Sequence, residues 1–101
     1  MSMQTDVLAS VPITGTGQFT NQTPTALGRT RVKAVYMVPT ASAGSVIFRD
    51  GGSGGATVMT LNTVASATQP TYLIFPGEGV LFNTNVHGTV TNVGSVTIFY
   101  G

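Results

Sequence analysis

Residues 45–62 decide the fold class, and they read SVIFRD (45–50), GGSGG (51–55) and ATVMTLN (56–62). The two outer runs are rich in Val, Ile, Thr and Phe, which favour extended strands. The middle run consists of Gly and Ser, and glycine accepts the positive φ angles that tight turns need. The stretch therefore predicts a β-hairpin.

The rest of the chain repeats this alternation of short strand and turn. In residues 31–38, Val32, Ala34, Tyr36 and Val38 alternate with Arg31, Lys33, Val35 and Met37, which is the period-two pattern of a strand. Further strands bounded by Pro, Gly or Asn are expected at 7–13, 71–75, 79–82, 86–91 and 95–100. No window carries an apolar stripe at helical spacing. We expect an all-β, antiparallel sandwich of about seven to eight short strands, with either a jelly-roll or an immunoglobulin-like topology.

The chain has 101 residues, the size of one ordinary domain, so residues 1–101 are expected to form a single β-sandwich domain. Residues 14–27 differ from the rest because Thr, Gly, Gln and Asn dominate them. Two interpretations stay open for this segment. It is either an extended, mobile arm or a long ordered connection across one end of the sandwich.

Charge is scarce in this sequence. Only 7% of the residues are charged, the formal net charge is +1, and 17 residues are Thr. An average globular protein has about 25% charged residues, and low charge promotes association. The composition favours a protein with many fixed neighbours, although a Thr-rich β-domain without such neighbours also fits, since Thr is a strand residue. Four basic residues make a poor footprint for nucleic acid, so no such partner is expected.

The chain has no cysteine and no signal-peptide pattern before Pro12, so neither disulfides nor secretion are expected. Its strongly apolar runs, such as 72–75, are only a few residues long, whereas a membrane-spanning helix needs about 20. We expect a soluble protein that has no membrane partner.

The few ionisable residues argue against an enzyme. The only acidic residues are Asp6, Asp50 and Glu78, and the only histidine is His87. Asp50 is expected to cap backbone amides of the Gly-rich turn, Glu78 to point outward from the turn at 76–79, and His87 to face outward from its strand. No Gly-x-Ser-x-Gly elbow accompanies the histidine. We therefore predict no catalytic residues, no metal site and no cofactor.

Two further features have structural interpretations. The glycines at 51–55 are not followed by the Gly-Lys-Ser/Thr and helix of a phosphate-binding loop, so the hairpin interpretation is preferred. The aromatic residues lie mostly in expected strands, where core packing is the default. Tyr100 is the best candidate for an aromatic residue at an interface. Even for Tyr100, however, a position in the core or at a sheet edge is favoured over an interface.

From Arg31 onward the chain also resembles a known group of proteins. The resemblance is carried by VIFRDGGSGG (46–55), LNT (61–63), FPGEGVLF (75–82) and the ending VTIFYG (96–101). These strings are similar to small virion structural proteins of marine tailed phages, in particular cyanophages of the podovirus kind. The resemblance implies a capsid decoration or cement protein that binds the major capsid protein in the virion, after assembly in the host cytoplasm.

Such a protein would contact a shell and other copies of itself, with a trimer preferred because lattice positions offer threefold symmetry. Arg29, Arg31 and Lys33 are the candidate capsid-contact residues, since like charges held together invite an anionic partner. A solvated strand edge is the alternative interpretation of this cluster. For the protein as a whole, the alternatives are a tail, neck or fibre component of the virion and a carbohydrate-binding or adhesive β-sandwich module.

Overall fold

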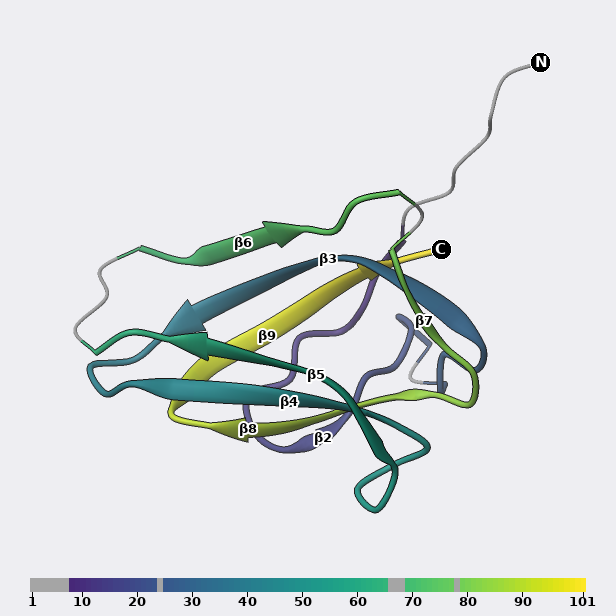
Figure 1. Cartoon of the computed structure of the whole chain (residues 1–101), viewed down its shortest axis with the longest axis horizontal. Coiled ribbons are helices and arrows are strands. Elements are labelled where there is room, and N and C mark those ends of the chain that lie inside the picture. The colour runs from purple at the N-terminus through teal and green to yellow at the C-terminus, as the bar shows by residue number, and fades with distance from the viewer. Residues whose placement is uncertain (1–7, 24, 66–68, 78) are drawn as a thin grey trace.

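The computed structural model describes residues 8–23, 25–65, 69–77 and 79–101. These residues form two antiparallel β-sheets packed as a sandwich (Figure 1), so the predicted all-β sandwich is confirmed. Within the described ranges there is no helix that is long and apolar enough to cross a membrane.

One sheet has five strands and the other has four. The five-stranded sheet has the order β1 (Leu8–Ala9), β9 (Val93–Tyr100), β3 (Thr30–Pro39) and β6 (Thr71–Ile74), with β7 (Val80–Phe82) also paired to β3. The four-stranded sheet has the order β2 (Gly17–Gln18), β8 (Val86–Thr91), β4 (Gly44–Asp50) and β5 (Ala56–Thr63).

The pairing of strands is that of a jelly roll. Strands β6 and β7 pair with successive parts of β3, so together they act as one interrupted strand. Counted in this way, the described residues form eight strands, and the first pairs with the last, the second with the seventh, the third with the sixth and the fourth with the fifth. This winding distinguishes the jelly roll from the immunoglobulin-like arrangement that the sequence left open.

The N-terminal third differs most from expectation. The strand predicted at 7–13 is reduced to β1 and an isolated pairing of Ile13 with Val96. The segment 14–27 contains the unpredicted strand β2 and the fully buried Phe19 in its described part. Strand β2 is only two residues long and begins with glycine, so it carries no periodic signal.

Three phenylalanines form the centre of the core. The rings of Phe19 and Phe48 stack with centroids 5.7 Å apart, and Phe48 meets Phe82 edge to face at 6.5 Å. All three side chains are fully buried. The remaining core residues are mainly valines with Met37, Ile98 and Tyr100. These side chains fill the space between the two sheets.

The strand alternation predicted for 31–38 is wrong in its second half. Val35 and Met37 are fully buried, whereas Tyr36 is 36% exposed. The register of β3 against β9 slips between Val32 and Ala34, because β3 advances by two residues there while β9 advances by one. This bulge at Lys33 moves every later side chain of β3 to the opposite face.

The predicted hairpin at 45–62 is confirmed. Asp50 pairs with Ala56, and residues 51–55 form the loop between β4 and β5. Gly51 and Gly52 have φ angles of 106° and 98°, which L-residues with a side chain rarely adopt. The glycines of this loop thus close the turn between the two strands.

Candidate binding surfaces

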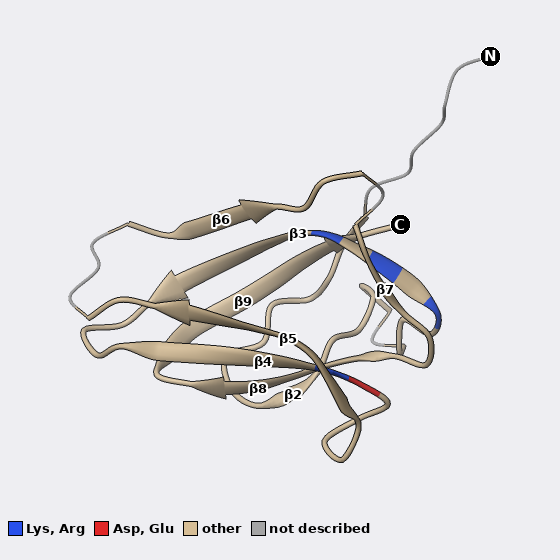
Figure 2. Ribbon diagram, in the orientation of Figure 1, with Lys and Arg blue, Asp and Glu red and all other residues tan. Residues whose placement is uncertain are grey.

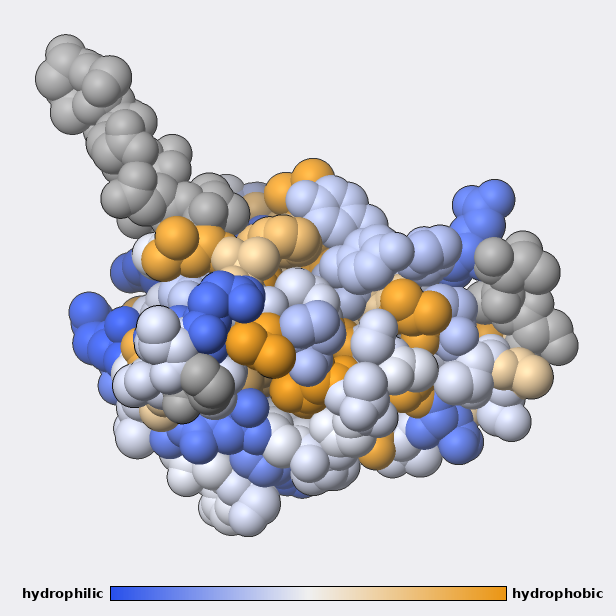
Figure 3. Space-filling model, turned by 180° about the vertical axis from the view of Figure 1, so that it is seen from behind, coloured by the Kyte–Doolittle hydropathy of each residue, from blue (hydrophilic) through white to orange (hydrophobic). Residues whose placement is uncertain are grey.

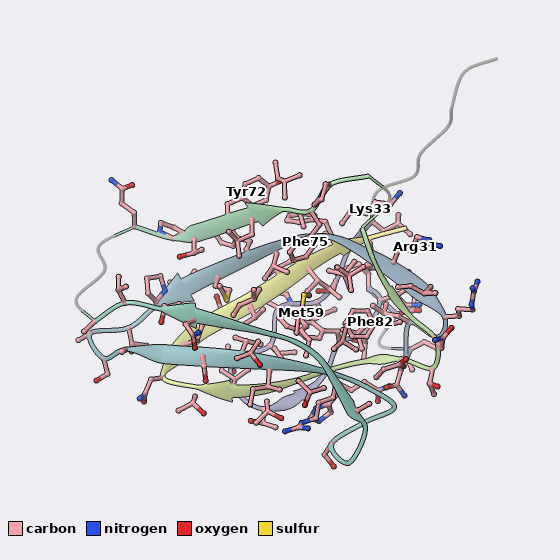
Figure 4. The ribbon with its side chains drawn as sticks, in the orientation of Figure 1. Arg31, Lys33, Met59, Tyr72, Phe75 and Phe82 are labelled. Atoms are coloured by element: carbon pink, nitrogen blue, oxygen red, sulfur yellow. The ribbon has the colours of Figure 1, made fainter. Side chains whose placement is uncertain are left out.

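The three candidate contact residues lie together at the start of β3 (Figure 2). Arg29 is exposed just before the strand, and Arg31 and Lys33 are partly buried within it. Figure 4 shows Arg31 and Lys33 at the same end of β3, close to the C-terminus. The backbone beneath them is held in place, because the amide of Gly101 donates to Arg31 O at 3.2 Å and that of Phe75 to Lys33 O at 2.9 Å. We call these three residues the basic cluster.

The segment 14–27 does not share a sheet with the basic cluster. Gly17 and Gln18 pair with β8 in the four-stranded sheet, whereas Arg31 and Lys33 belong to the five-stranded sheet. The described acidic residue Asp50 also lies in the other sheet, on β4 (Figure 2). Asp50 nevertheless lies at the same end of the sandwich as the basic cluster, because it accepts from the amide of Asn83, which follows Phe82, the partner of Thr30.

An exposed apolar surface covers the outer face of the five-stranded sheet. Tyr36 of β3 lies directly opposite Tyr72 of β6, and in the next row Ala34 lies between Ile74 and Phe99. Tyr72 is 54% exposed and Ile74 is 71% exposed. The rings of Tyr72 and Phe99 meet edge to face, with centroids 6.0 Å apart. We call these five residues the aromatic face.

Sequence reasoning missed the aromatic face for a definite reason. An unbroken period of two puts Tyr36 on the same side as Val32 and Ala34, and core packing is the default expectation for a strand aromatic. The bulge at Lys33 turns Tyr36 outward and brings it beside Tyr72. The only signal in the sequence is the apolar character of both alternating sets of residues in the second half of 31–38, which makes the choice of buried side ambiguous.

The outer face of the four-stranded sheet is polar and hydrogen-bonded. Gln18, His87, Arg49 and Thr57 form one row across its four strands. The Arg49 guanidinium donates to Thr57 Oγ1 at 3.0 Å and to Thr89 Oγ1 at 3.4 Å. These contacts hold the only charged side chain of the row against its neighbours.

The prediction that His87 faces outward from its strand is only partly right. His87 does point to the outer side of its sheet, because a side chain at the neighbouring Gly88 would point inward against Phe19 and Ile13. However, His87 is only 8% exposed, so it does not face solvent as expected. Its Nδ1 atom is buried and has no hydrogen-bond partner among the described residues.

Asp50 caps backbone amides, as expected, but not those of the Gly-rich turn. Its carboxylate accepts hydrogen bonds from the amides of Asn83, Thr84 and Asn85, at 2.9, 2.8 and 3.4 Å. Asn85 in turn accepts from the amide of Gly51 at 3.3 Å. The amides of Asn83 and Thr84 lower the pKa of Asp50, with a smaller contribution in the same direction from Asn85, while desolvation acts in the opposite direction.

The described residues offer no constellation for acid–base or metal chemistry. Asp6 and Glu78 lie outside the described residues. The prediction that Glu78 points outward therefore falls outside them too. The carboxylate of Asp50 is engaged by three backbone amides. No group of three or more His, Cys, Asp or Glu side chains is placed to hold a metal ion in the part of the chain that the structure describes.

An open hollow of about 400 Å³ lies beside β1, and it is lined by Leu8, Ala9, Asn21, Gln22, Thr23 and Tyr100. Gln22 ties its wall to β1 by donating from Nε2 to the carbonyl of Ala9 at 3.0 Å. Tyr100 is 8% exposed and belongs to the core, so the favoured structural position for this residue is confirmed. Among the residues that the structure describes, the lining carries no ionisable group apart from the Tyr100 hydroxyl.

No protein-family model, no curated protein and no solved structure matches this chain. What the chain does is therefore inferred from its composition, its fold and the surfaces described above.

Proposed function

We propose that this chain is a structural protein of a phage virion, a decoration or cement protein that binds the outside of the major capsid protein lattice. The aromatic face carries this proposal. It presents Tyr36, Tyr72 and Ile74 on a rigid sheet without a covering element among the described residues. Contiguous apolar surface on a small domain marks a site of interaction. A protein that binds a capsid shell permanently needs such a site.

The composition supports docking among many neighbours. With 7% charged residues, the protein has few groups that resist close approach of another neutral surface. Figure 3 shows side chains of intermediate hydropathy over much of one side of the molecule, with apolar side chains between them. The resemblance to small virion proteins of marine tailed phages points the same way. The jelly roll adds a fold-level analogy, since viral capsid domains use it.

The basic cluster indicates which kind of partner surface the proposed contact would need. Arg31 and Lys33 lie on the same strand as Tyr36, so β3 contributes to both the basic cluster and the aromatic face. Three like charges favour an acidic partner surface, which the major capsid protein would supply. The alternative is a solvated strand edge, at which Lys prevents pairing with another strand. Removal of the positive charges distinguishes the two interpretations.

The proposed role involves no catalysis, no cofactor, and no nucleic-acid or membrane partner. The partners are the major capsid protein and further copies of the same chain, and the location is the capsid surface after assembly in the host cytoplasm. The scarcity of acids and the engagement of Asp50 by backbone amides support a structural role over an enzymatic one.

Cryo-electron microscopy of the particle tests the location. Copies spread over the icosahedral shell are expected. Copies confined to the tail, the neck or a fibre, with a correspondingly low number per particle, would replace the decoration role by the alternative virion role.

Binding to empty shells tests the contact residues. Replacing Arg29, Arg31 and Lys33 together by Gln should lower occupancy and flatten its dependence on salt, because the ionic part of the contact is lost. Tyr72→Ser with Ile74→Ser should lower occupancy at every salt concentration. Gln18→Ser with Thr91→Ser, on the other sheet, is the matched control and should bind fully. Full occupancy by both test variants would refute this footprint.

The aromatic face also favours a second candidate, a carbohydrate-binding module. Two exposed tyrosines directly opposite each other on one face of a sheet offer aromatic rings against which the C–H groups of sugar rings could pack. Lectin domains are among the known uses of the jelly roll. Binding on a glycan array that Tyr72→Ala abolishes and Thr91→Ala preserves would support this candidate, whereas absence of binding to every glycan would remove it.

A further inference from the structure

Strand β5 has a long free edge. The four-stranded sheet ends at β5, which pairs with β4 on one side and with no other strand of the described chain on the other. Its eight residues, Ala56–Thr63, include no charged residue and no proline. Edge strands in soluble proteins usually carry such residues, because unpaired backbone groups otherwise attract another strand. The edge of β5 lacks this protection.

The interior of the sandwich is also incomplete beside β5. Met59 pairs with Phe48 and Leu61 pairs with Val46, so both point toward the core, yet both are only partly buried. Leu73 and Phe75 from the edge of the other sheet are partly buried as well. Figure 4 shows Met59 and Phe75 in the space between the sheets. A strand added at this edge would cover these apolar side chains.

The other edges in the described chain are poorer places for such an addition. Strands β1 and β2, at the opposite side of the sandwich, have two residues each, and β6 has four. Along β5 itself, Val58 is a bulge, because Phe48 pairs with Met59 while the next residue, Arg49, pairs with Thr57. The regular part of the edge is therefore 59–63.

We propose that β5 pairs antiparallel with β5 of a second copy across a twofold axis, joining the two four-stranded sheets into one continuous sheet. The strand is self-complementary over its regular part, since inward Met59 and Leu61 alternate with outward Thr60 and Asn62. A pair centred on Thr60 sets Met59 opposite Leu61 of the second copy and the two Thr60 side chains opposite each other, so the regular pairing spans 59–61 of each copy. Threonine pairs of this kind stabilise antiparallel strands.

A second copy fits this edge better than a different partner. The edge has no charge with which to select an unlike protein, and its alternation matches its own reverse. The contact closes a dimer, in place of the trimer expected from threefold lattice positions. It uses the edge of the four-stranded sheet and leaves the aromatic face and the basic cluster free, so it does not depend on the virion role.

Addition of a charge tests the contact. We expect purified protein to show a reversible monomer–dimer equilibrium in sedimentation velocity at micromolar concentrations. Thr60→Lys should shift the protein to monomer, because two like charges meet at the axis, while Thr91→Lys, an exposed position on the central strand β8, should leave the dimer intact. Melting curves of both variants report whether the fold is retained. A wild-type monomer throughout, or a dimer that Thr60→Lys leaves unchanged, would overturn the proposal.

Cross-linking provides a second measurement that does not need the lysine variant to fold. The chain contains no cysteine, so Thr60→Cys introduces a single thiol. A short bis-maleimide should link Thr60→Cys into dimers within minutes and leave Thr91→Cys monomeric. Equal cross-linking of both variants, or ladders of higher species, would contradict a closed twofold contact at β5.

Discussion

The two outer faces of the sandwich have opposite chemistry. On the four-stranded sheet, Arg49 is hydrogen-bonded to Thr57 and Thr89, and its neighbour His87 is covered. On the five-stranded sheet, Tyr72 and Ile74 are more than half exposed. The first face largely satisfies its polar groups within the chain, whereas the second leaves apolar side chains without cover among the described residues. The proposed docking through the five-stranded sheet is based on this difference.

The two faces owe their difference to pairing irregularities as much as to composition. The bulge at Lys33 turns Tyr36 outward on one sheet and buries Val35 and Met37 beneath it. Without that bulge, the alternation of β3 would place Tyr36 in the core. The place of Tyr36 on the aromatic face is thus a consequence of one extra residue in β3.

The core shared by both faces should give the largest effect on stability. Phe48→Ala removes a fully buried ring that contacts Phe19 and Phe82, and it should lower the free energy of unfolding by about 3–5 kcal/mol. Urea unfolding followed by circular dichroism measures the loss. A loss below about 1 kcal/mol would mean that the sheets do not pack through this cluster.

A methyl group added beneath the polar face should give a smaller effect. A Cβ at Gly88 would lie 3.0 Å from Phe19 Cε2 and 3.2 Å from Ile13 Cδ1, so Gly88→Ala should cost about 1–3 kcal/mol by overpacking. Gly54→Ala is the control, since a Cβ there meets nothing within 4 Å. Equal unfolding midpoints for the two variants in urea would show that the core beneath β8 yields freely.

Substitutions on the aromatic face should affect stability little and binding strongly. Tyr72→Ala loses the edge-to-face contact with Phe99 and should cost about 0.5–1.5 kcal/mol, while Ile74→Thr, at a position 71% exposed, should change stability by less than about 0.5 kcal/mol. Chemical denaturation measures both changes. If Ile74→Thr destabilises the fold as much as Phe48→Ala does, the face is structural and not a binding surface.

Low pH should weaken the hydrogen bonds that Asp50 accepts at one end of the sandwich. The pKa of Asp50 is lowered in the folded protein by the amides of Asn83 and Thr84, so its ionised form stabilises the fold above its unfolded pKa of about 3.9. This contribution is lost as the pH falls from about 4 through the lowered pKa. The difference in melting temperature between wild type and Asp50→Asn should therefore shrink below pH 4. A constant difference down to pH 2 would contradict this assignment.

The amino-acid sequence is enough to predict the all-β class, the hairpin at 45–62 and the approximate bounds of the later strands, including 86–91. These features depend on residues close together in the chain, because alternation, β-branched side chains and turn glycines act locally. The scarcity of acidic residues and histidine is likewise a property of the composition alone, since folding cannot add ionisable groups to the chain.

The folded structure is needed to know which strands pair, which side of β3 is buried and which partner each polar group has. The jelly-roll order joins β1 to β9 across almost the whole chain, and Asp50 meets Asn83 and Thr84 over a separation of more than 30 residues. Such contacts depend on the packing of two sheets and on the bulge at Lys33, which no local pattern encodes. The aromatic face and the free edge of β5 arise from the same packing, and so they exist only in the folded chain.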